Sequence, residues 1–183
     1  MCFMTKCPYV PPHEFNLDFP HLMLRYRALQ KKQNKLTLIP AQLAKIDRNA
    51  KIGVMFSWFV NWVSDVKNKF LRKILELAVG IDKRAKLPTY NSETFTNYFK
   101  RNNNSINIKE IDKSRKVVIY STCFVNFNKK VTGVAALKVL KKNGVEVKEA
   151  YPGCCGMPFL EQADLLKVVE QANKVSKELL EWV

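Results

Sequence analysis

Five cysteines are the residues of this chain whose types and spacing could do chemistry. Three of them form one group, in which Cys123 is followed 31 residues later by the adjacent pair Cys154 and Cys155. Gly153 and Gly156 flank the pair, and glycine lets the backbone turn tightly and approach a ligand closely. Cysteine thiolates are preferred ligands of zinc and of iron–sulfur clusters. The group therefore predicts a site for a metal, for a cluster, or for thiol–disulfide chemistry.

Simple packing explains the adjacent pair poorly. A single cysteine often behaves as a small buried hydrophobic residue, and that interpretation suits Cys123 taken alone. It does not suit Cys154 and Cys155, because they lie between two glycines and two prolines. A disulfide between adjacent cysteines would strain the backbone. The first residues do not resemble an export signal, so we expect no structural disulfide.

Cys2 and Cys7 form the second group, and Cys7 precedes a proline. A Cys-Pro pair that ends a run of closely spaced cysteines is typical of ferredoxin-type motifs, in which the last cysteine ligates the second cluster. Two cysteines alone indicate such a motif only weakly. The same segment, residues 1–21, contains several prolines, which fix φ and remove backbone donors, so we expect a loop there.

The elements that must position the three-cysteine group follow residue 113. The sequence predicts a strand over 116–121, a helix over 131–142, a strand over 145–150 and a helix over 162–183. This βαβα order predicts an α/β fold with a parallel pair of strands. Parallel neighbours bring their carboxyl ends to the same edge of a sheet. The sulfurs of the three-cysteine group are therefore expected to converge at that edge.

The region before residue 114 is predicted to be mostly helical. Helices are expected over 22–33, over 40–50, and over 54–79, where a glycine ends the last one. A turn over 86–91 follows, and then a short helix through Lys100 that Ser92 would cap. Residues 101–113 are polar and rich in asparagine, which predicts a linker. The chain is thus expected to divide into residues 1–21, 22–113 and 114–183.

The most apolar stretch, residues 52–63, is too short to span a bilayer. Helical periodicity continues beyond it, and the main interpretation is a helix that faces the core. The alternative is a surface helix that docks on a membrane or a partner, with Trp58 and Trp62 as interfacial anchors. The cations of that surface would be Lys67, Lys69, Arg72 and Lys73.

The net charge of +15 lies almost entirely in the first 120 residues, which hold 22 Lys or Arg against nine Asp or Glu. Such an excess can indicate contact with nucleic acid or an anionic surface. However, the chain has 24 Lys and only seven Arg beside 15 Asn, a composition that codon bias in an AT-rich genome would produce. Nucleic-acid recognition relies on arginine and aromatic stacking, so this interpretation ranks last.

Cys123 and the later Cys-Cys-Gly-Met-Pro of residues 154–158 resemble the first part of the CCG, or cysteine-rich, domain. That domain occurs in heterodisulfide reductase subunits and in the iron–sulfur subunits of anaerobic glycerol-3-phosphate dehydrogenase and glycolate oxidase. Residues 2–13 are similar to the end of the ferredoxin module that precedes CCG domains in this family. Residues 18–23, 80–84 and 87–88 are similar to the family's linker.

The resemblance implies an iron–sulfur electron-transfer component of an oxidoreductase, like heterodisulfide reductase. It implies [4Fe–4S] cofactors, with Cys2 and Cys7 as ligands of two ferredoxin-type clusters. It also implies a CCG cluster on Cys123, Cys154 and Cys155. The implied partner is a flavoprotein or another redox subunit. The expected location is the cytoplasm, either free or peripheral to the inner face of the membrane.

Two departures from the family pattern indicate a fragment. No further cysteine precedes Cys2 and none follows Cys155, where the family pattern has additional ligands. We therefore expect missing sequence or a second chain to complete the cluster sites, and the chain is expected to act as an oxidoreductase component only when completed.

Two hypotheses of other classes stay open beside this one. The first is a thiol-redox or zinc-binding protein that uses Cys123, Cys154 and Cys155 by themselves. The second is a basic protein that binds nucleic acid or an anionic surface through residues 1–120. The only histidines, His13 and His21, are expected to be structural, because no carboxylate or serine lies at a catalytic spacing.

Overall fold

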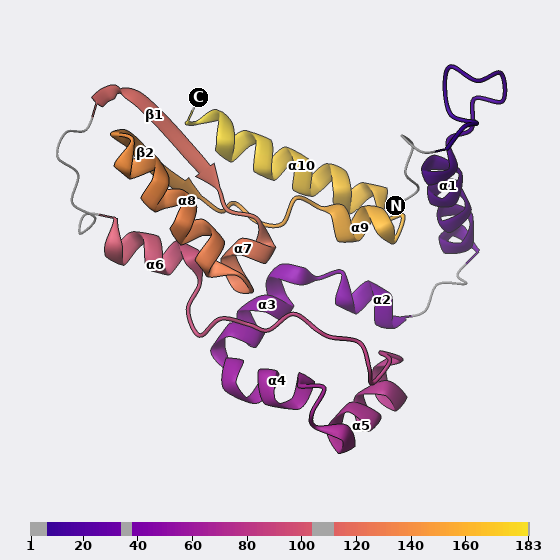
Figure 1. Cartoon of the computed structure of the whole chain (residues 1–183). Coiled ribbons are helices and arrows are strands. Elements are labelled where there is room, and N and C mark those ends of the chain that lie inside the picture. The colour runs from indigo at the N-terminus through magenta and orange to yellow at the C-terminus, as the bar shows by residue number, and fades with distance from the viewer. Residues whose placement is uncertain (1–6, 34–37, 104–111, 183) are drawn as a thin grey trace.

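The computed structural model describes residues 7–33, 38–103 and 112–182. Ten helices and two strands lie within these ranges (Figure 1). In chain order they are α1 (Phe19–Lys32), α2 (Leu38–Leu43), α3 (Ile46–Met55), α4 (Ser57–Ser64), α5 (Lys69–Val79), α6 (Phe95–Asn102), β1 (Asp112–Tyr120), α7 (Cys123–Phe127), α8 (Lys130–Lys142), β2 (Val145–Ala150), α9 (Met157–Glu161) and α10 (Leu165–Leu180).

The two strands pair in parallel, as the sequence predicts. Val117 lies opposite Val147, and Tyr120 lies opposite Ala150 at the carboxyl end of the sheet. Helix α8 connects the strands, so β1, α8 and β2 form the expected βαβ unit. In the view of Figure 1 the sheet lies between α8 and α10. The α/β prediction is therefore confirmed for this part of the chain.

Aromatic residues of α6 complete the core of the βαβ unit. Phe95 and Phe99 pack with Leu137 of α8 and with Val145 and Val147 of β2. The approach of α6 to α8 requires a glycine, because a Cβ at Gly133 would lie 2.7 Å from the Phe95 ring. Burial of large apolar side chains is the main stabilising term in such a core. Helix α6 thus belongs energetically with the residues that follow it in the sequence.

The single helix predicted over 54–79 is wrong, because three helices, α3, α4 and α5, cover that region. Phe56 leaves helical geometry with φ −111° and ψ 34° between the first two. Asp65 is extended, and its carboxylate accepts a hydrogen bond of 2.9 Å from the Lys67 backbone N–H. Asn68 then caps α5 by accepting from Leu71 N–H. These short polar side chains compete with the helix for backbone donors.

Other boundaries also differ from the predictions. The helix expected over 40–50 is split between α2, which ends at Leu43, and α3. Thr94 rather than Ser92 caps α6, because its side chain accepts from Asn97 N–H at 3.1 Å. The last helix begins at Leu165 instead of residue 162, after the short α9. The linker predicted over 101–113 falls mostly outside the described residues.

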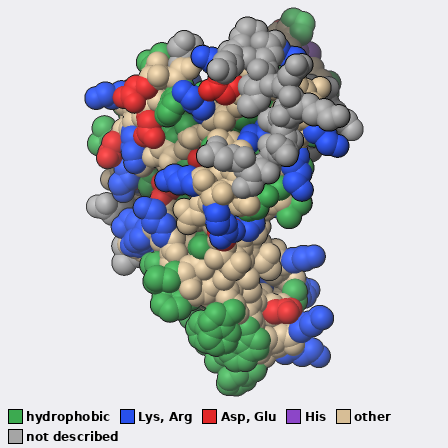
Figure 2. Space-filling model, turned by 90° about the vertical axis from the view of Figure 1, so that its left-hand side faces the viewer, with side chains coloured by type: hydrophobic (Ala, Val, Ile, Leu, Met, Phe, Trp, Pro, Cys, Tyr) green, Lys and Arg blue, Asp and Glu red, His purple; other side chains and the backbone are tan. Residues whose placement is uncertain are grey.

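The expectation that the apolar helix faces the core is wrong for its largest side chains. Trp58 in α4 is 76% exposed and Leu77 in α5 is 81% exposed. Figure 2 shows hydrophobic side chains gathered at the lower end of the molecule, at the level of these helices in Figure 1. No helix of the described residues is both long enough and apolar enough to cross a membrane.

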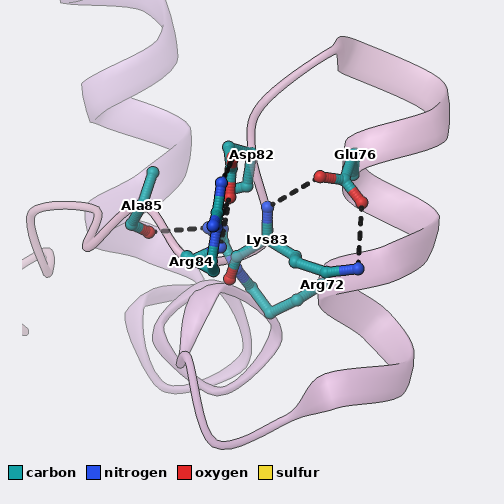
Figure 3. Close-up of polar contacts among 6 residues, drawn as sticks. All are labelled: Arg72, Glu76, Asp82, Lys83, Arg84 and Ala85. Carbon is teal, nitrogen blue, oxygen red and sulfur yellow. Dashed lines mark hydrogen bonds and ion pairs between the residues drawn. The ribbon is translucent and has the colours of Figure 1, made fainter.

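Arg72 is not the surface cation that the sequence suggests. It is 1% exposed, and its guanidinium donates hydrogen bonds to the backbone carbonyls of Asp82, Lys83 and Ala85 (Figure 3). The planar, multiply donating guanidinium suits this arrangement of carbonyls. Glu76, one turn later in α5, accepts from Lys83 N–H at 3.2 Å. Helix α5 therefore fixes the loop that follows Gly80.

Candidate thiol site at the carboxyl edge of the sheet

Cys123 and Cys154 follow the two strands and meet at the carboxyl end of the sheet. Cys123 is the first residue of α7, which begins where Thr122 caps the helix by accepting from Val125 N–H. Cys154 and Cys155 lie in the loop between β2 and α9. Cys154 is 3% exposed, Cys123 is half-buried and Cys155 is exposed. The predicted convergence is thus present for two thiols, with the third beside them on the surface.

The Cys123 and Cys154 thiols lie close enough that each shifts the pKa of the other. This interaction lowers the pKa of Cys123 to about 7, because the Cys154 thiol stabilises the Cys123 thiolate, and the backbone of Phe124 stabilises it further. The same interaction raises the pKa of Cys154, and burial raises it further. The pair is therefore asymmetric, because one sulfur is poised to ionise near neutral pH while the other keeps its proton.

Two glycines shape the loop that carries the cysteine pair. Gly153 has φ +145° and Gly156 has φ +93°, values that other residues rarely adopt. Gly156 also precedes α9, and its carbonyl accepts from Phe159 N–H at 3.0 Å. The tight geometry predicted from these two glycines is therefore confirmed.

Three residues that belong to no recognisable sequence motif surround the thiols. Asp47 of α3 accepts hydrogen bonds from the Tyr151 hydroxyl at 2.5 Å and from Cys154 N–H at 3.0 Å. Tyr120, at the end of β1, donates from its hydroxyl to the Gly153 carbonyl at 2.9 Å. Both tyrosines end or follow a strand next to the cysteines, which is a signal that could have identified them. Nothing near Asp47 in the sequence indicates its role.

Burial and nearby acidic groups keep both tyrosine hydroxyls protonated. Burial raises the pKa of Tyr120 to about 12, and the three neighbouring cysteines add to the shift. Burial also raises the pKa of Tyr151, and its hydrogen bond to Asp47 adds to the effect. Each hydroxyl therefore stays a hydrogen-bond donor over the whole neutral range.

The three cysteines have the right chemistry to ligate a metal ion or an iron–sulfur cluster, but their arrangement does not complete a binding site. Cys123 and Cys154 lie close together, and Cys155 follows Cys154 directly in the sequence. Within residues 7–33, 38–103 and 112–182, however, no three His, Cys, Asp or Glu side chains are arranged as a group that could hold a metal ion. A Cys₄ cluster site needs four ligands. The described residues thus supply part of a ligand set.

The second predicted group is placed only in part. Cys7 is half-buried, with a free thiol, in the turns before α1. Cys2 lies outside the described residues, so its proposed role as a ligand stays a prediction. Tyr9, His13 and Phe15 form an aromatic cluster after Cys7, and His13 Nδ1 accepts from Phe15 N–H at 3.1 Å. That contact agrees with the structural role expected for this histidine.

Comparison with known proteins bears out the resemblance. Residues 117–181 match the family model of the cysteine-rich domain, CCG. The chain is 28% identical over 131 residues to a subunit of anaerobic glycerol-3-phosphate dehydrogenase from Escherichia coli strain K12, and equally to that from Escherichia coli O157:H7. The alignment covers 71% of this chain and 32% of each relative, so the chain spans about a third of the relatives' length. No solved structure matches the chain.

Proposed function

We propose, from the CCG match of residues 117–181 and the paired thiols within it, that this chain is an iron–sulfur electron-transfer component of an oxidoreductase. The observation that carries the proposal is the proximity of Cys123 to the buried Cys154 at the carboxyl edge of the sheet. The match to a dehydrogenase subunit supports an oxidoreductase. A likeness to heterodisulfide reductase is the finer form of the same proposal.

Cys123, Cys154 and Cys155 would hold the cluster of the CCG unit, and Cys2 and Cys7 would ligate ferredoxin-type clusters. A [4Fe–4S] cluster supplies one-electron transfer when bound. The chain's own contribution is to bring the thiols together, to bury one of them, and to lower the pKa of Cys123 so that a thiolate ligand forms near neutral pH. Further ligands would complete the set.

Anaerobic reconstitution tests the proposal directly. The reduced chain is incubated with ferrous iron and sulfide, desalted, and assayed for iron content, visible absorption and paramagnetic resonance after reduction. We expect thiolate-to-iron absorption that is lost in Cys123→Ser and Cys154→Ser and persists in Tyr26→Phe, at an exposed tyrosine of α1. Iron uptake that is equal in all four proteins would contradict the assignment to the CCG unit.

A thiol-redox or zinc-binding protein is the second candidate, and the asymmetric pKa values of Cys123 and Cys154 favour it specifically. A thiolate beside a protonated thiol is the arrangement of a reactive dithiol. The same anaerobic preparation separates the two functions. A colourless protein that forms a reversible Cys123–Cys154 disulfide, or that retains zinc, would replace the electron-transfer proposal.

The redox partner is proposed to be a flavoprotein or another subunit of a multi-subunit enzyme. The apolar face of α4 and α5 is proposed to dock peripherally on the inner face of the membrane. Its exposed aromatic side chains are Trp58, Phe59, Trp62 and Phe70. Exposed Lys67, Lys69 and Lys73 lie beside them in the sequence. Aromatic anchors flanked by lysines suit an anionic lipid interface.

A further inference from the structure

Asp47 reaches the cysteine loop from a distant part of the chain. It lies in the first turn of α3, which packs against α7, and it is 107 residues from Cys154 in the sequence. Its Oδ2 accepts from Cys154 N–H at 3.0 Å, and its Oδ1 accepts from the Tyr151 hydroxyl at 2.5 Å. Hydrogen bonds to a carboxylate are shorter and stronger than neutral ones. One side chain thus ties two points of the loop to α3.

The loop is built to receive this carboxylate. A Cβ at Gly153 would lie 3.1 Å from Asp47 Oδ2, closer than most side chains tolerate. The same Cβ would lie 3.5 Å from Gln171 Oε1 and 3.7 Å from Lys174 Nζ of α10. Polar groups of α3 and of α10 therefore surround the glycine that precedes the cysteine pair. The loop is held between the two helices at this point.

The hydrogen bond from Cys154 N–H to Asp47 restrains the backbone of the residue that carries the buried thiol. A fixed N–H direction at Cys154 limits its φ, and thus limits where its side chain points. In the fixed conformation the Cys154 thiol is buried against Cys123, and the next thiol, Cys155, is exposed. Among the described residues, Asp47 is the one acceptor that contacts Cys154 N–H. Loss of this hydrogen bond would therefore leave the N–H direction unrestrained.

We infer that Asp47 is a positioning residue of the thiol site, which orients Cys154 toward Cys123 by accepting the Cys154 N–H and Tyr151 hydroxyl hydrogen bonds. The thiol site is then assembled by two segments, the α3 helix and the residues after β1. Any effect of Asp47 on cluster binding rests on the proposed function, whereas its effect on the orientation of the metal-free loop does not.

Pulse labelling of the reduced, metal-free full chain tests the inference. Each cysteine is alkylated with iodoacetamide for a series of times, and peptide mass mapping gives a rate for each site. Asp47→Ala is expected to raise the Cys154 rate by about tenfold or more, the effect of losing a charge-assisted hydrogen bond in a buried loop. Asp47→Asn keeps an acceptor for Cys154 N–H and a donor for the Tyr151 oxygen, so its rate is expected to rise much less than that of Asp47→Ala, the remaining rise coming from loss of the carboxylate charge.

Matched measurements separate positioning from general loss of stability. Asp65→Ala removes a carboxylate of the α4–α5 turn and is expected to leave the Cys154 rate unchanged. Amide hydrogen exchange is compared between residues 151–156 and residues 145–150 of β2, and Asp47→Ala is expected to raise exchange only in the first peptide. Should Asp47→Ala not fold, Tyr151→Phe removes one of the two bonds and is expected to raise the same peptide's exchange to a smaller degree. Unchanged Cys154 protection, or an equal rise in both peptides, would overturn the inference.

Cobalt(II) titration of the full chain then links the inference to ligand binding. The cobalt–thiolate absorption measures the affinity for cobalt. Asp47→Ala is expected to weaken this affinity about 10- to 100-fold, as loss of a residue that orients metal ligands does. Asp47→Asn is expected to restore most of the affinity. Failure of the wild-type chain to bind iron–sulfur or cobalt through these thiols would remove the proposed function. The labelling result would still decide the role of Asp47.

Discussion

The Tyr120 hydroxyl donates a 2.9 Å hydrogen bond to the carbonyl of Gly153. The bond joins the end of β1 to the loop after β2, next to the cysteine pair. Tyr120→Phe leaves the buried carbonyl without this donor. We expect the free energy of unfolding, measured by urea denaturation, to fall by about 1–3 kcal/mol. Tyr26→Phe, at an exposed tyrosine of α1, serves as the control and is expected to change it little.

The alkylation rate of Cys123 is expected to depend on pH with a midpoint near 7, because the thiolate is the reactive form. The rate should rise as pH increases through this value. Cys154→Ala removes the thiol that stabilises the Cys123 thiolate, so the midpoint should move to higher pH. Cys155→Ala is the matched control, since the Cys155 charge opposes ionisation of Cys123, and it is expected not to raise the midpoint. A midpoint that Cys154→Ala leaves in place would show that another group lowers this pKa.

The contact between Gly133 and Phe95 predicts coupled substitutions. Phe95→Ala removes a fully buried ring and is expected to cost about 3–5 kcal/mol of unfolding free energy. Gly133→Ala places a methyl group against that ring and is expected to cost about 1–3 kcal/mol. In the double variant the methyl group occupies part of the emptied space, so the two costs should not add. Additive costs in denaturation experiments would contradict the packing of α6 on α8.

The buried guanidinium of Arg72 is expected to stabilise the loop after α5. Arg72→Met leaves three backbone carbonyls without a donor and should lower the free energy of unfolding by at least about 1–3 kcal/mol, the cost of one orphaned buried acceptor. Arg84→Met alters an exposed ion pair with Asp82 in the same loop and is expected to change the free energy of unfolding much less, because solvent screens exposed pairs. Equal effects of the two substitutions in urea denaturation would exclude the role assigned to Arg72.

Vesicle co-sedimentation tests the proposed docking face. The chain is expected to bind vesicles that contain anionic lipid more tightly than zwitterionic vesicles. The pair Trp58→Ala and Trp62→Ala should lower the partition coefficient at least about tenfold, because burial of one large apolar side chain is worth about 1.5–3 kcal/mol. Leu166→Ala with Leu180→Ala, at exposed positions of α10, is the control. An equal loss in both pairs would indicate non-specific adsorption.

The sequence was sufficient to predict what local pattern determines. The β-branched and apolar residues of 117–119 and 145–147 predict strands, and the intervening helical periodicity predicts their parallel pairing. The meeting of Cys123 with Cys154 follows from that topology. Gly153 and Gly156 predict the tight loop because few other residues adopt positive φ.

Features that depend on distant contacts or on single residues were not predictable in this way. Asp47 has no local motif, and its role appears only when α3 packs beside the cysteine loop. Apolar periodicity runs through Phe56 and Asp65, so it concealed the two breaks in the helix expected over 54–79. Five-residue helices such as α7 and α9 are too short to give a periodic signal. The burial of Arg72 likewise depends on a loop ten residues further along the chain.

Residues 117–181, which match the cysteine-rich domain, depend on earlier residues for part of their core packing and hydrogen bonding. Phe95 and Phe99 of their core, and the carboxylate of Asp47, come from earlier in the chain. A graft of residues 117–181 into another protein would transfer the cysteines while leaving behind an aromatic layer and the loop's anchor. The smallest transferable module therefore begins no later than α3. Protein engineers who exchange such cysteine-rich segments between redox scaffolds should set the junction before Ile46.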